Sequence, residues 1–281
     1  MIIQFISDLH LDISKHLEMP GGDVLIIAGD ACEARELVRE YHTTKVLPYT
    51  GGSFPCYDFF EFECAKYKKV FYVMGNHEHY GGDFAKGRSR FNDFASDHYL
   101  ANIRLLDKET VKIDGYEFIG GTLWTDFNDM DSYTMFHAEQ AMNDYKGVKN
   151  TNDTVSYKFL PKHALRDHST MRGYLQTCMD NYKESGRTDN KVVVVTHHAP
   201  SPLSIHEKYK SDTLMNGNFH SNMNDFIEND GGLFNLFNLF KKHCNSYYCI
   251  IIHNLIQKIL SDLKKNNSSS ERSIFYYGEL F

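Results

Sequence analysis

The chain has 281 residues, of which 42% are hydrophobic and 24% charged, and its formal net charge is −7. This composition is that of an average globular protein, and it excludes a collagen-like repeat, a coiled coil and a chain that is disordered throughout. The acidic balance also argues against a protein whose main role is to coat nucleic acid, because that binding relies on many Lys and Arg contacts to phosphate. The length suits one large α/β domain or two smaller domains.

Six cysteines are spread along the chain without a Cys-x-x-Cys pair and are too dilute for a disulfide scaffold. We interpret them as reduced thiols, which indicates a cytoplasmic protein. Residues 1–5 form a short apolar run without the zones of a signal peptide. Residues 247–263 are too polar for a membrane span and predict an amphipathic helix. We therefore expect no membrane association and no obligate protein partner.

Five short apolar runs, each ending in a polar cluster, predict buried strands at residues 2–6, 24–28, 70–74, 116–119 and 192–196. Helical spacing predicts helices at residues 34–41, 57–67, 136–145 and 162–183. Alternation of strands and helices predicts a layered α/β fold.

The composition changes near Asp230. Residues 231–281 carry a net charge of +3 and are rich in Asn, Lys and Ser, which leaves −10 for residues 1–230. We therefore expect a folded domain over residues 1–230. The divergent tail over residues 231–281 would contain the amphipathic helix and a polar, low-complexity run at residues 264–270.

Four of the predicted strands end in small or polar residues that include side chains able to bind metal ions. In open α/β sheets, ligands bind in the crevice beyond the carboxyl ends of the strands. Mixed Asp, Asn and His side chains suit Mn, Fe or Zn rather than a thiolate site. The four clusters are Ser7-Asp8-Leu9-His10, Ala28-Gly29-Asp30, Met74-Gly75-Asn76-His77-Glu78-His79 and Thr196-His197-His198-Ala199-Pro200.

The spacing within two of these clusters suggests how they could bind ions. In an extended segment, residues two apart project the same way, so Asp8 and His10 could both face one ion. The glycine before Asp30 lets the backbone turn sharply and exposes a carboxylate, whose two oxygens can bridge two cations. Each cluster alone has an ordinary structural explanation, and only their combination indicates a metal site.

The order Asp-x-His, Gly-Asp, Gly-Asn-His-Glu and His-His before a proline, each at a strand end, resembles the calcineurin-like metallophosphoesterase family, including its bacterial and phage-type members. The resemblance covers residues 1 to about 230. It implies an α/β sandwich of two β-sheets flanked by helices, with a dinuclear metal centre at its edge that hydrolyses phosphate esters. Substrates could be phosphorylated small molecules, nucleotides or nucleic acids, because the same centre serves all of them.

The resemblance also implies a set of metal ligands. Asp8 and His10 would hold the first divalent ion, and Asp30 would bridge both ions. Asn76 and His197 would hold the second ion. The pair of ions, Mn, Fe or Zn, would clamp phosphoryl oxygens and lower the pKa of a bound water, so that hydroxide attacks phosphorus in line.

His77 would be the catalytic acid, which stabilises the transition state or protonates the leaving oxygen. His198 remains an alternative to His197 as a metal ligand. His197 is preferred because the family's ligand stands immediately after the strand.

The family's final Gly-His-x-His motif, whose histidines complete both metal shells, does not occur after His198. We do not assign the isolated His220, His243 and His253 as substitutes. A frameshift downstream of Asp230 would explain the loss. We expect weakened metal retention and impaired activity; the alternatives are a catalytically degenerate relative that acts as a binding module, and a protein in which one ion only holds loops together.

Two further features are a basic group that follows the third cluster and a tryptophan that follows the predicted strand at residues 116–119. Lys86, Arg88 and Arg90 form a small basic group, which we interpret as a solvated loop, with a phosphate-steering patch as the alternative. Trp124, the sole tryptophan, is expected to pack beside the site.

Overall fold

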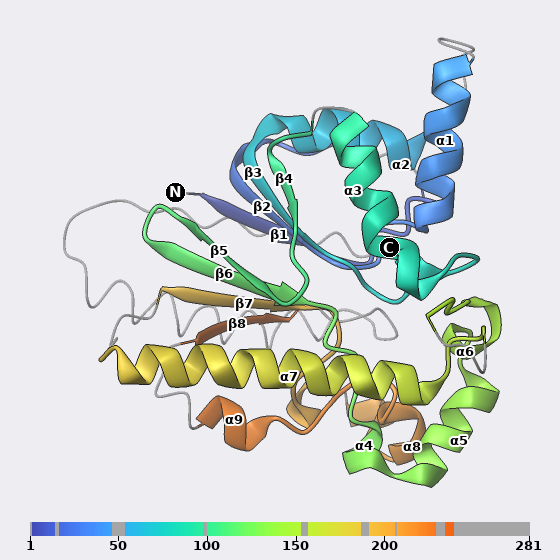
Figure 1. The fold of residues 1–281 in the computed structure, drawn as a ribbon, viewed down its shortest axis with the longest axis vertical. Coiled ribbons are helices and arrows are strands. Elements are labelled where there is room, and N and C mark those ends of the chain that lie inside the picture. The colour runs from blue at the N-terminus through green and yellow to red at the C-terminus, as the bar shows by residue number, and fades with distance from the viewer. Residues whose placement is uncertain are drawn as a thin grey trace.

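The computed structural model describes residues 2–14, 17–46, 54–97, 100–152, 157–186, 191–205, 207–228 and 234–238. Two four-stranded sheets pack face to face, and helices cover their outer faces (Figure 1). This arrangement confirms the predicted α/β sandwich. The amphipathic helix expected at residues 247–263 and the low-complexity run at residues 264–270 lie outside the described residues.

The first sheet has the strand order β1-β2-β3-β4 and is parallel throughout. Its carboxyl ends therefore lie at one edge, where loops from neighbouring strands can meet. Figure 1 shows three helices over its outer face: α1 (Ala34–Val46), α2 (Pro55–Asp58) and α3 (Gly87–Asp97). The strands are β1 (Ile3–Ile6), β2 (Gly22–Ala28), β3 (Tyr67–Val73) and β4 (Ile103–Leu105).

The second sheet has the order β5-β6-β7-β8, in which β5 is antiparallel to β6 and the other pairs are parallel. Its strands are β5 (Glu109–Ile113), β6 (Tyr116–Gly121), β7 (Val192–Thr196) and β8 (Phe234–Asn238). The long helix α7 (Pro161–Glu184) and α9 (Asn224–Glu228) lie along its outer side (Figure 1). Four short helices group near one end of the sheet: α4 (Phe127–Met130), α5 (Ser132–Ala141), α6 (Asp144–Gly147) and α8 (Thr213–Asn216).

Apolar side chains alternate between two layers along the central strands. In β2, Ile26 belongs to the core between the sheets, whereas Ile27 packs in the core beneath the helices. Val195 of β7 enters the core between the sheets from the other side. Phe71 of β3 stacks on Phe118 of β6 with ring centroids 4.4 Å apart, which joins the two sheets. Burial on both faces explains why these strands are almost continuously apolar.

The five predicted strands are all present, with ends that shift by up to three residues. Three other strands were not predicted. β4 is too short to show a pattern, and β5 carries alternating polar residues at the edge of its sheet. β8 lies in the predicted tail and pairs with β7 over five residues, so the sheet continues beyond Asp230. The domain boundary at residue 230 stays a prediction.

Two of the predicted helices differ in the structure. The segment at residues 57–67 is a succession of α2, a π-helical turn and a 3₁₀ turn, and it ends where Tyr67 pairs with Gly22 and β3 begins. The helix expected at residues 136–145 is divided into α5 and α6. The predicted helices at residues 34–41 and 162–183 are confirmed as α1 and α7.

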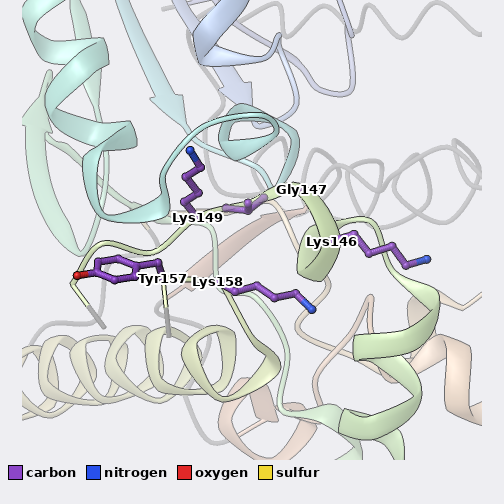
Figure 2. Close-up of a pocket in the computed structure, with 6 residues that line it drawn as sticks. Lys146, Gly147, Lys149, Tyr157 and Lys158 are labelled. Carbon is purple, nitrogen blue, oxygen red and sulfur yellow. The ribbon is translucent and has the colours of Figure 1, made fainter. Parts of the chain in front are cut away.

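A pocket of about 430 Å³ lies beside α6 (Figure 2). Lys149 pairs with Lys158 in an isolated antiparallel bridge and with Asp83, from the loop after β3, in a parallel one. These bridges hold the pocket against that loop. The lining residues are Lys146, Gly147, Val148, Lys149, Tyr157 and Lys158. Within the part of the chain that the structure describes, no helix is long and apolar enough to cross a membrane.

Candidate metal centre

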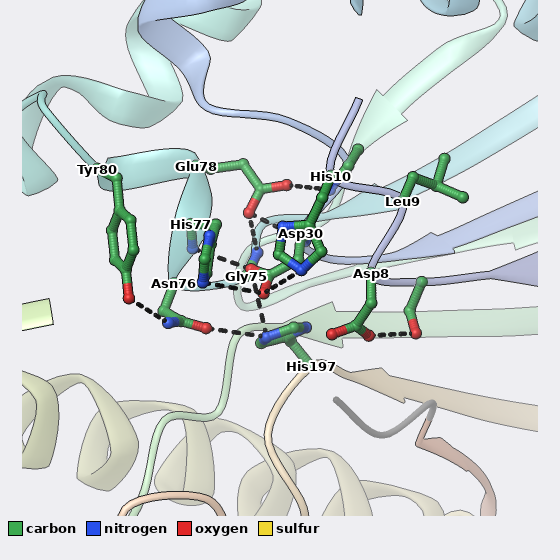
Figure 3. Close-up of polar contacts among 12 residues, drawn as sticks. Asp8, Leu9, His10, Asp30, Gly75, Asn76, His77, Glu78, Tyr80 and His197 are labelled. Atoms are coloured by element: carbon green, nitrogen blue, oxygen red, sulfur yellow. Dashed lines mark hydrogen bonds and ion pairs between the residues drawn. The ribbon is translucent and has the colours of Figure 1, made fainter. Parts of the chain in front are cut away.

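Side chains that follow β1, β2, β3 and β7 meet at one place (Figure 3). Asp30, which follows β2, is fully buried at its centre. The Nε2 atoms of His10 and His77 lie 3.9 and 4.0 Å from its Oδ2, and Nε2 of His197 lies 3.4 Å from its Oδ1. Two atoms that each lie about 2.1 Å from one ion are roughly 3–3.5 Å apart. The separation of His197 from Asp30 falls in this range and those of His10 and His77 are about half an ångström longer, so a buried carboxylate surrounded by three imidazole nitrogens forms a candidate site for a divalent cation.

The orientation of His197 supplies a more specific indication of a cation. Its Nδ1 lies 2.9 Å from the carbonyl oxygen of Ala28, and since a carbonyl can only accept, Nδ1 carries a hydrogen. The remaining nitrogen, Nε2, lies 3.1 Å from Oδ1 of Asn76. In the neutral imidazole, Nε2 then carries a lone pair, and this lone pair faces the oxygens of Asn76 and Asp30. A metal ion or a proton between these atoms removes the repulsion, and a carbonyl partner on the far nitrogen is typical of histidine ligands.

The amide of Asn76 is oriented by the same network. Its Nδ2 donates to the hydroxyl of Tyr80 at 3.2 Å, which turns Oδ1 toward His197. Asn76 is therefore presented to the site through the oxygen, the atom that binds hard and borderline cations.

Two glycines allow the loops after β2 and β3 to approach closely. A Cβ atom at Gly75 would lie 2.2 Å from Oδ1 of Asp30, and one at Gly29 would lie 2.4 Å from Nδ1 of His197. Gly29 also has a φ of 91°, which agrees with the predicted sharp turn. The Gly75 backbone is not left-handed, so this glycine is required for space rather than for its conformation.

The backbone around Asp8 and His10 differs from the expectation. The prediction that these residues lie in an extended segment is wrong, because their φ angles are 55° and 45°, and Asp30 has a φ of 54°. Their N–H groups instead continue the pairing with the second strand, from Asp8 to Gly29 and from His10 to Asp30, at 3.0 Å each. Left-handed backbone at a non-glycine residue is uncommon and costs about 1–3 kcal/mol. Three of the eleven described non-glycine residues with positive φ are predicted ligands.

The structure does not bring all predicted residues equally close. His10, Asp30 and His77 each offer an atom, and the three atoms lie within 4.8 Å of one another. His77, predicted as the acid, thus lies in the same cluster as the predicted ligands. Asp8 is at the edge of the group in Figure 3, where its carboxylate accepts a hydrogen bond of 2.6 Å from the Ser7 hydroxyl.

His198 contacts the ring of His197 edge-on at a centroid distance of 5.1 Å, but it packs mainly on the opposite side. Its ring stacks on Trp124 at a centroid distance of 5.2 Å, and its backbone N–H donates to Thr122. Trp124 is buried and also stacks on His79, at 6.2 Å. The geometry favours His197 over His198 at the candidate centre, and Trp124 packs beside it as expected.

Glu78 has a role that sequence reasoning did not assign. It is 2% exposed, and its carboxylate accepts hydrogen bonds from the N–H groups of Asp30, Ala31 and Gly75 and from the hydroxyl of Tyr72. Burial and the nearby Asp30 raise the pKa of Glu78 to about 7, while these four donors favour its ionised form. Glu78 thereby ties the loop after β3 to the loop after β2. The signal that the sequence offered for this role was the presence of Glu78, a charged residue, in the polar cluster that follows β3.

Tyr80 was also missed. Its ring stacks on His77 with centroids 4.1 Å apart. Its hydroxyl accepts from Asn76 and donates to Oδ2 of Asp144 at 3.3 Å. Burial and the Asp144 carboxylate raise the pKa of Tyr80, so the hydroxyl remains a donor. No pattern could reveal a contact with Asp144, which is 64 residues away.

Comparisons with known proteins agree with this architecture. A family model described as calcineurin-like phosphoesterase matches residues 1–232. An uncharacterized protein of Acanthamoeba polyphaga mimivirus is 25% identical over 239 residues, which cover 80% of each chain. The crystal structure of a phosphopantetheinyl hydrolase from Mycobacterium tuberculosis aligns with a TM-score of 0.53 and 14% identity, over 85% of this chain and 81% of that one. This last likeness concerns the fold.

Proposed function

This chain belongs to the calcineurin-like phosphoesterase family, and we propose that it hydrolyses phosphate ester bonds with two divalent metal ions bound where the two sheets meet. The observation that carries the proposal is the convergence of Asp30, Asn76 and His197. Nε2 of His197 lies 3.1 Å from the Asn76 amide oxygen and 3.4 Å from the Asp30 carboxylate, and its far nitrogen is fixed by a carbonyl. Such an arrangement of electron-pair donors is stabilised by a cation.

The donor set suits Mn, Fe or Zn, because it combines carboxylate, amide oxygen and imidazole without a thiolate. In our assignment Asp8 and His10 would hold one ion, Asn76 and His197 would hold the other, and Asp30 would contribute to both. When bound, the two ions would supply an activated water and clamp the phosphoryl oxygens. The protein itself orients the ligands, through the carbonyl of residue 28 on one side and a tyrosine hydroxyl on the other.

His77 is the proposed general acid. Its backbone N–H donates to Oδ1 of Asp30 at 2.9 Å, and Tyr80 packs against its ring, so the imidazole has a defined position. The side chain is 22% exposed and can therefore reach a substrate. From this position Nε2 can stabilise the departing oxygen or deliver a proton to it, which is worth about 100- to 10,000-fold in rate.

The proposed substrates are phosphomonoesters or phosphodiesters, including nucleotides, and the proposed location is the cytoplasm. Three free cysteines, Cys32, Cys56 and Cys64, are buried in the described part of the chain. A hydrogen bond with Cys56 together with burial raises the pKa of Cys32, and burial raises the pKa of Cys64, which keeps these thiols protonated and unreactive. Reduced, inert thiols are compatible with that location.

A second candidate function is a degenerate family member that binds a phosphorylated ligand without hydrolysing it. The observation that favours it is the sequence after β8. That strand runs parallel to β7, so its carboxyl end points to the candidate centre, yet the residues after it, Leu-Phe-Lys-Lys-His at 239–243, do not form a Gly-His-x-His motif. An incomplete ligand shell would weaken metal retention and lower activity.

Manganese-dependent hydrolysis of p-nitrophenyl phosphate and bis-p-nitrophenyl phosphate distinguishes the two candidates. We expect hydrolysis by the wild type that is lost in Asp30→Ala and in His77→Ala. Lys69→Gln is the control, because Lys69 is exposed at the other end of β3 from the centre. Equal background rates in the wild type and both site variants would support the degenerate binding protein.

A further inference from the structure

The pocket beside α6 is lined by cationic side chains (Figure 2). Three of its six lining residues are lysines, Lys146, Lys149 and Lys158, and none of the six is acidic. Its volume of about 430 Å³ falls within the roughly 300–1,000 Å³ of small-ligand sites. In a chain with a net charge of −7, this lining is selective for an anion.

Two of the lysines have no carboxylate partner within the described residues. Lys149 forms no hydrogen bond or ion pair through its amine there, and the amine of Lys146 donates to the carbonyl of Ala141 at 3.3 Å. Lys158 lies 3.6 Å from the carboxylate of Glu139. The positive charge of the pocket is therefore largely uncompensated.

The basic group near the third sequence cluster is a weaker candidate for binding phosphate. Arg88 pairs with Asp107 at 3.1 Å, and Lys86 lies 3.9 Å from Asp83. These acids already neutralise the charges that an incoming phosphate would need.

Lys149 and Lys158 are paired directly opposite each other in their antiparallel bridge. Like charges in this position destabilise the pairing. Figure 2 shows the two amines diverging, with Lys149 directed toward the loop after β3. This divergence keeps the two positive charges apart, so the bridge forms without a bound ligand.

A chain of contacts connects one wall of the pocket to the candidate metal centre. Asn76 donates to the hydroxyl of Tyr80, which donates to Asp144 in the first turn of α6. The pocket begins two residues later, at Lys146. Since a helix rises about 1.5 Å per residue, the pocket starts close to the end of this chain.

The opposite wall is joined to the same loop by its backbone. The N–H of Lys149 donates to the carbonyl of Gly82 at 3.0 Å. Gly82 follows His77 by five residues, and consecutive Cα atoms are about 3.8 Å apart, so these two residues are at most about 19 Å apart. A 3₁₀ turn at His77–His79 shortens that separation. One wall of the pocket is therefore tied to the loop that carries His77.

Tyr157 adds an aromatic surface to the lysine-lined wall. Its side chain is 66% exposed, and its carbonyl accepts from the N–H of Asn150, which fixes the backbone of the loop. An exposed ring beside lysines provides a stacking surface for a nucleobase together with positive charge for its phosphate.

We propose that this pocket binds the phosphate and base of a nucleotide unit adjoining the scissile phosphate, with Lys149 on the phosphate and Tyr157 against the base. The substrates are then nucleotides with more than one phosphate, or short oligonucleotides. The identity of the reaction rests on the proposed function, whereas binding in the pocket does not.

The test measures binding without metal. Fluorescence anisotropy in EDTA and low salt follows two probes, a fluorescein-labelled tetrathymidylate and ribose-labelled ADP. Lys149→Gln should weaken the binding of at least one probe by roughly tenfold, and Tyr157→Leu should weaken it by a similar factor. For the oligonucleotide, Lys149→Gln should also lower the salt slope by about 1. Lys69→Gln, which removes the same charge elsewhere, should bind as the wild type does.

Either pattern of probe dependence supports the inference and identifies the substrate: an effect on ADP alone indicates a free nucleotide, and an effect on the tetrathymidylate indicates an oligonucleotide. Matching melting temperatures of all three variants exclude unfolding as the cause. The inference is overturned if the wild type binds neither probe or if Lys149→Gln behaves like Lys69→Gln. Because no hydrolysis is measured, this failure is separate from loss of the proposed phosphoesterase function.

Discussion

The two sheets contribute unequally to the candidate centre. Loops after β1, β2 and β3 of the first sheet carry Asp8, His10, Asp30, Asn76 and His77, whereas the second sheet contributes His197 after β7. The first sheet can do this because three adjacent parallel strands end at the same edge. In the second sheet β5 runs the other way, and β6 ends in two glycines. The first sheet thus supplies most of the candidate residues, and the second sheet adds one histidine to them.

The largest effect should come from the first sheet, at its central carboxylate. We expect Asp30→Asn to lower hydrolysis by about 1,000-fold or more, because metal stabilisation of a transition state is worth several kcal/mol and each 1.4 kcal/mol is a factor of ten. Steady-state rates with manganese and metal content after dialysis provide the measurement. Retention of both metal and activity would show that the first sheet does not assemble the centre.

The same variant should be more stable than the wild type without metal. Asp30 and Glu78 are both buried, and the charge of Asp30 helps to raise the pKa of Glu78. Removing one carboxylate charge should therefore raise the free energy of unfolding in EDTA at pH 8 by about 1–2 kcal/mol. Urea denaturation measures this difference, and a loss of stability would mean that Asp30 is not under electrostatic repulsion.

The contribution of the second sheet is tested by two adjacent histidines. His197→Gln should reduce hydrolysis by about 100-fold and weaken metal binding, because it removes a nitrogen 3.4 Å from Asp30. His198→Gln should change the rate by less than about fivefold, since that ring packs on Trp124 instead. Metal titration of both variants accompanies the rates. The reverse order of effects would assign the ligand to His198.

The two regions also meet at His79, which follows the first sheet and stacks on Trp124, which follows β6. Burial lowers the pKa of His79 from 6.5 to about 4. Between these values the unfolded chain binds a proton that the folded chain does not, so stability falls as the pH falls from about 6.5 toward 4. Between pH 7 and pH 5 the free energy of unfolding of the wild type should therefore fall, and His79→Phe should make this fall about 2 kcal/mol smaller. Urea unfolding in EDTA at both pH values checks this, and identical pH dependence would contradict it.

The smallest effect concerns the tyrosine that links the centre to α6. Tyr80→Phe keeps the ring on His77 but removes the hydroxyl that joins Asn76 to Asp144, and we expect a rate loss of about tenfold. Tyr80→Leu, which also removes the stacking partner of His77, should reduce the rate further. If His77 protonates the leaving oxygen, this additional loss should be greater for phenyl phosphate than for p-nitrophenyl phosphate, whose leaving group needs no proton. An equal loss for both substrates would limit Tyr80 to a structural role.

Much of the centre could be predicted from the sequence because its ligands are local in the chain. Each stands within a few residues of an apolar run, and parallel strands bring such positions to one edge. The residues that stabilise the centre are different. Glu78 could be seen but not assigned, because two of its four partners lie in the loop after β2. Tyr80 meets an acid in a helix whose position no local pattern predicts.

By itself, the sequence determined the fold class and the central strands and supplied the candidate site residues, since hydrophobic periodicity and strand-end motifs are local properties. The tertiary structure decided which of two adjacent histidines faces Asp30, since a side chain's direction depends on strand register and on the carbonyl that fixes its ring. It also decided that Asp8 and His10 have left-handed rather than extended backbone. The lysine pocket is likewise tertiary, because its wall forms only when Lys149 pairs with residues 83 and 158.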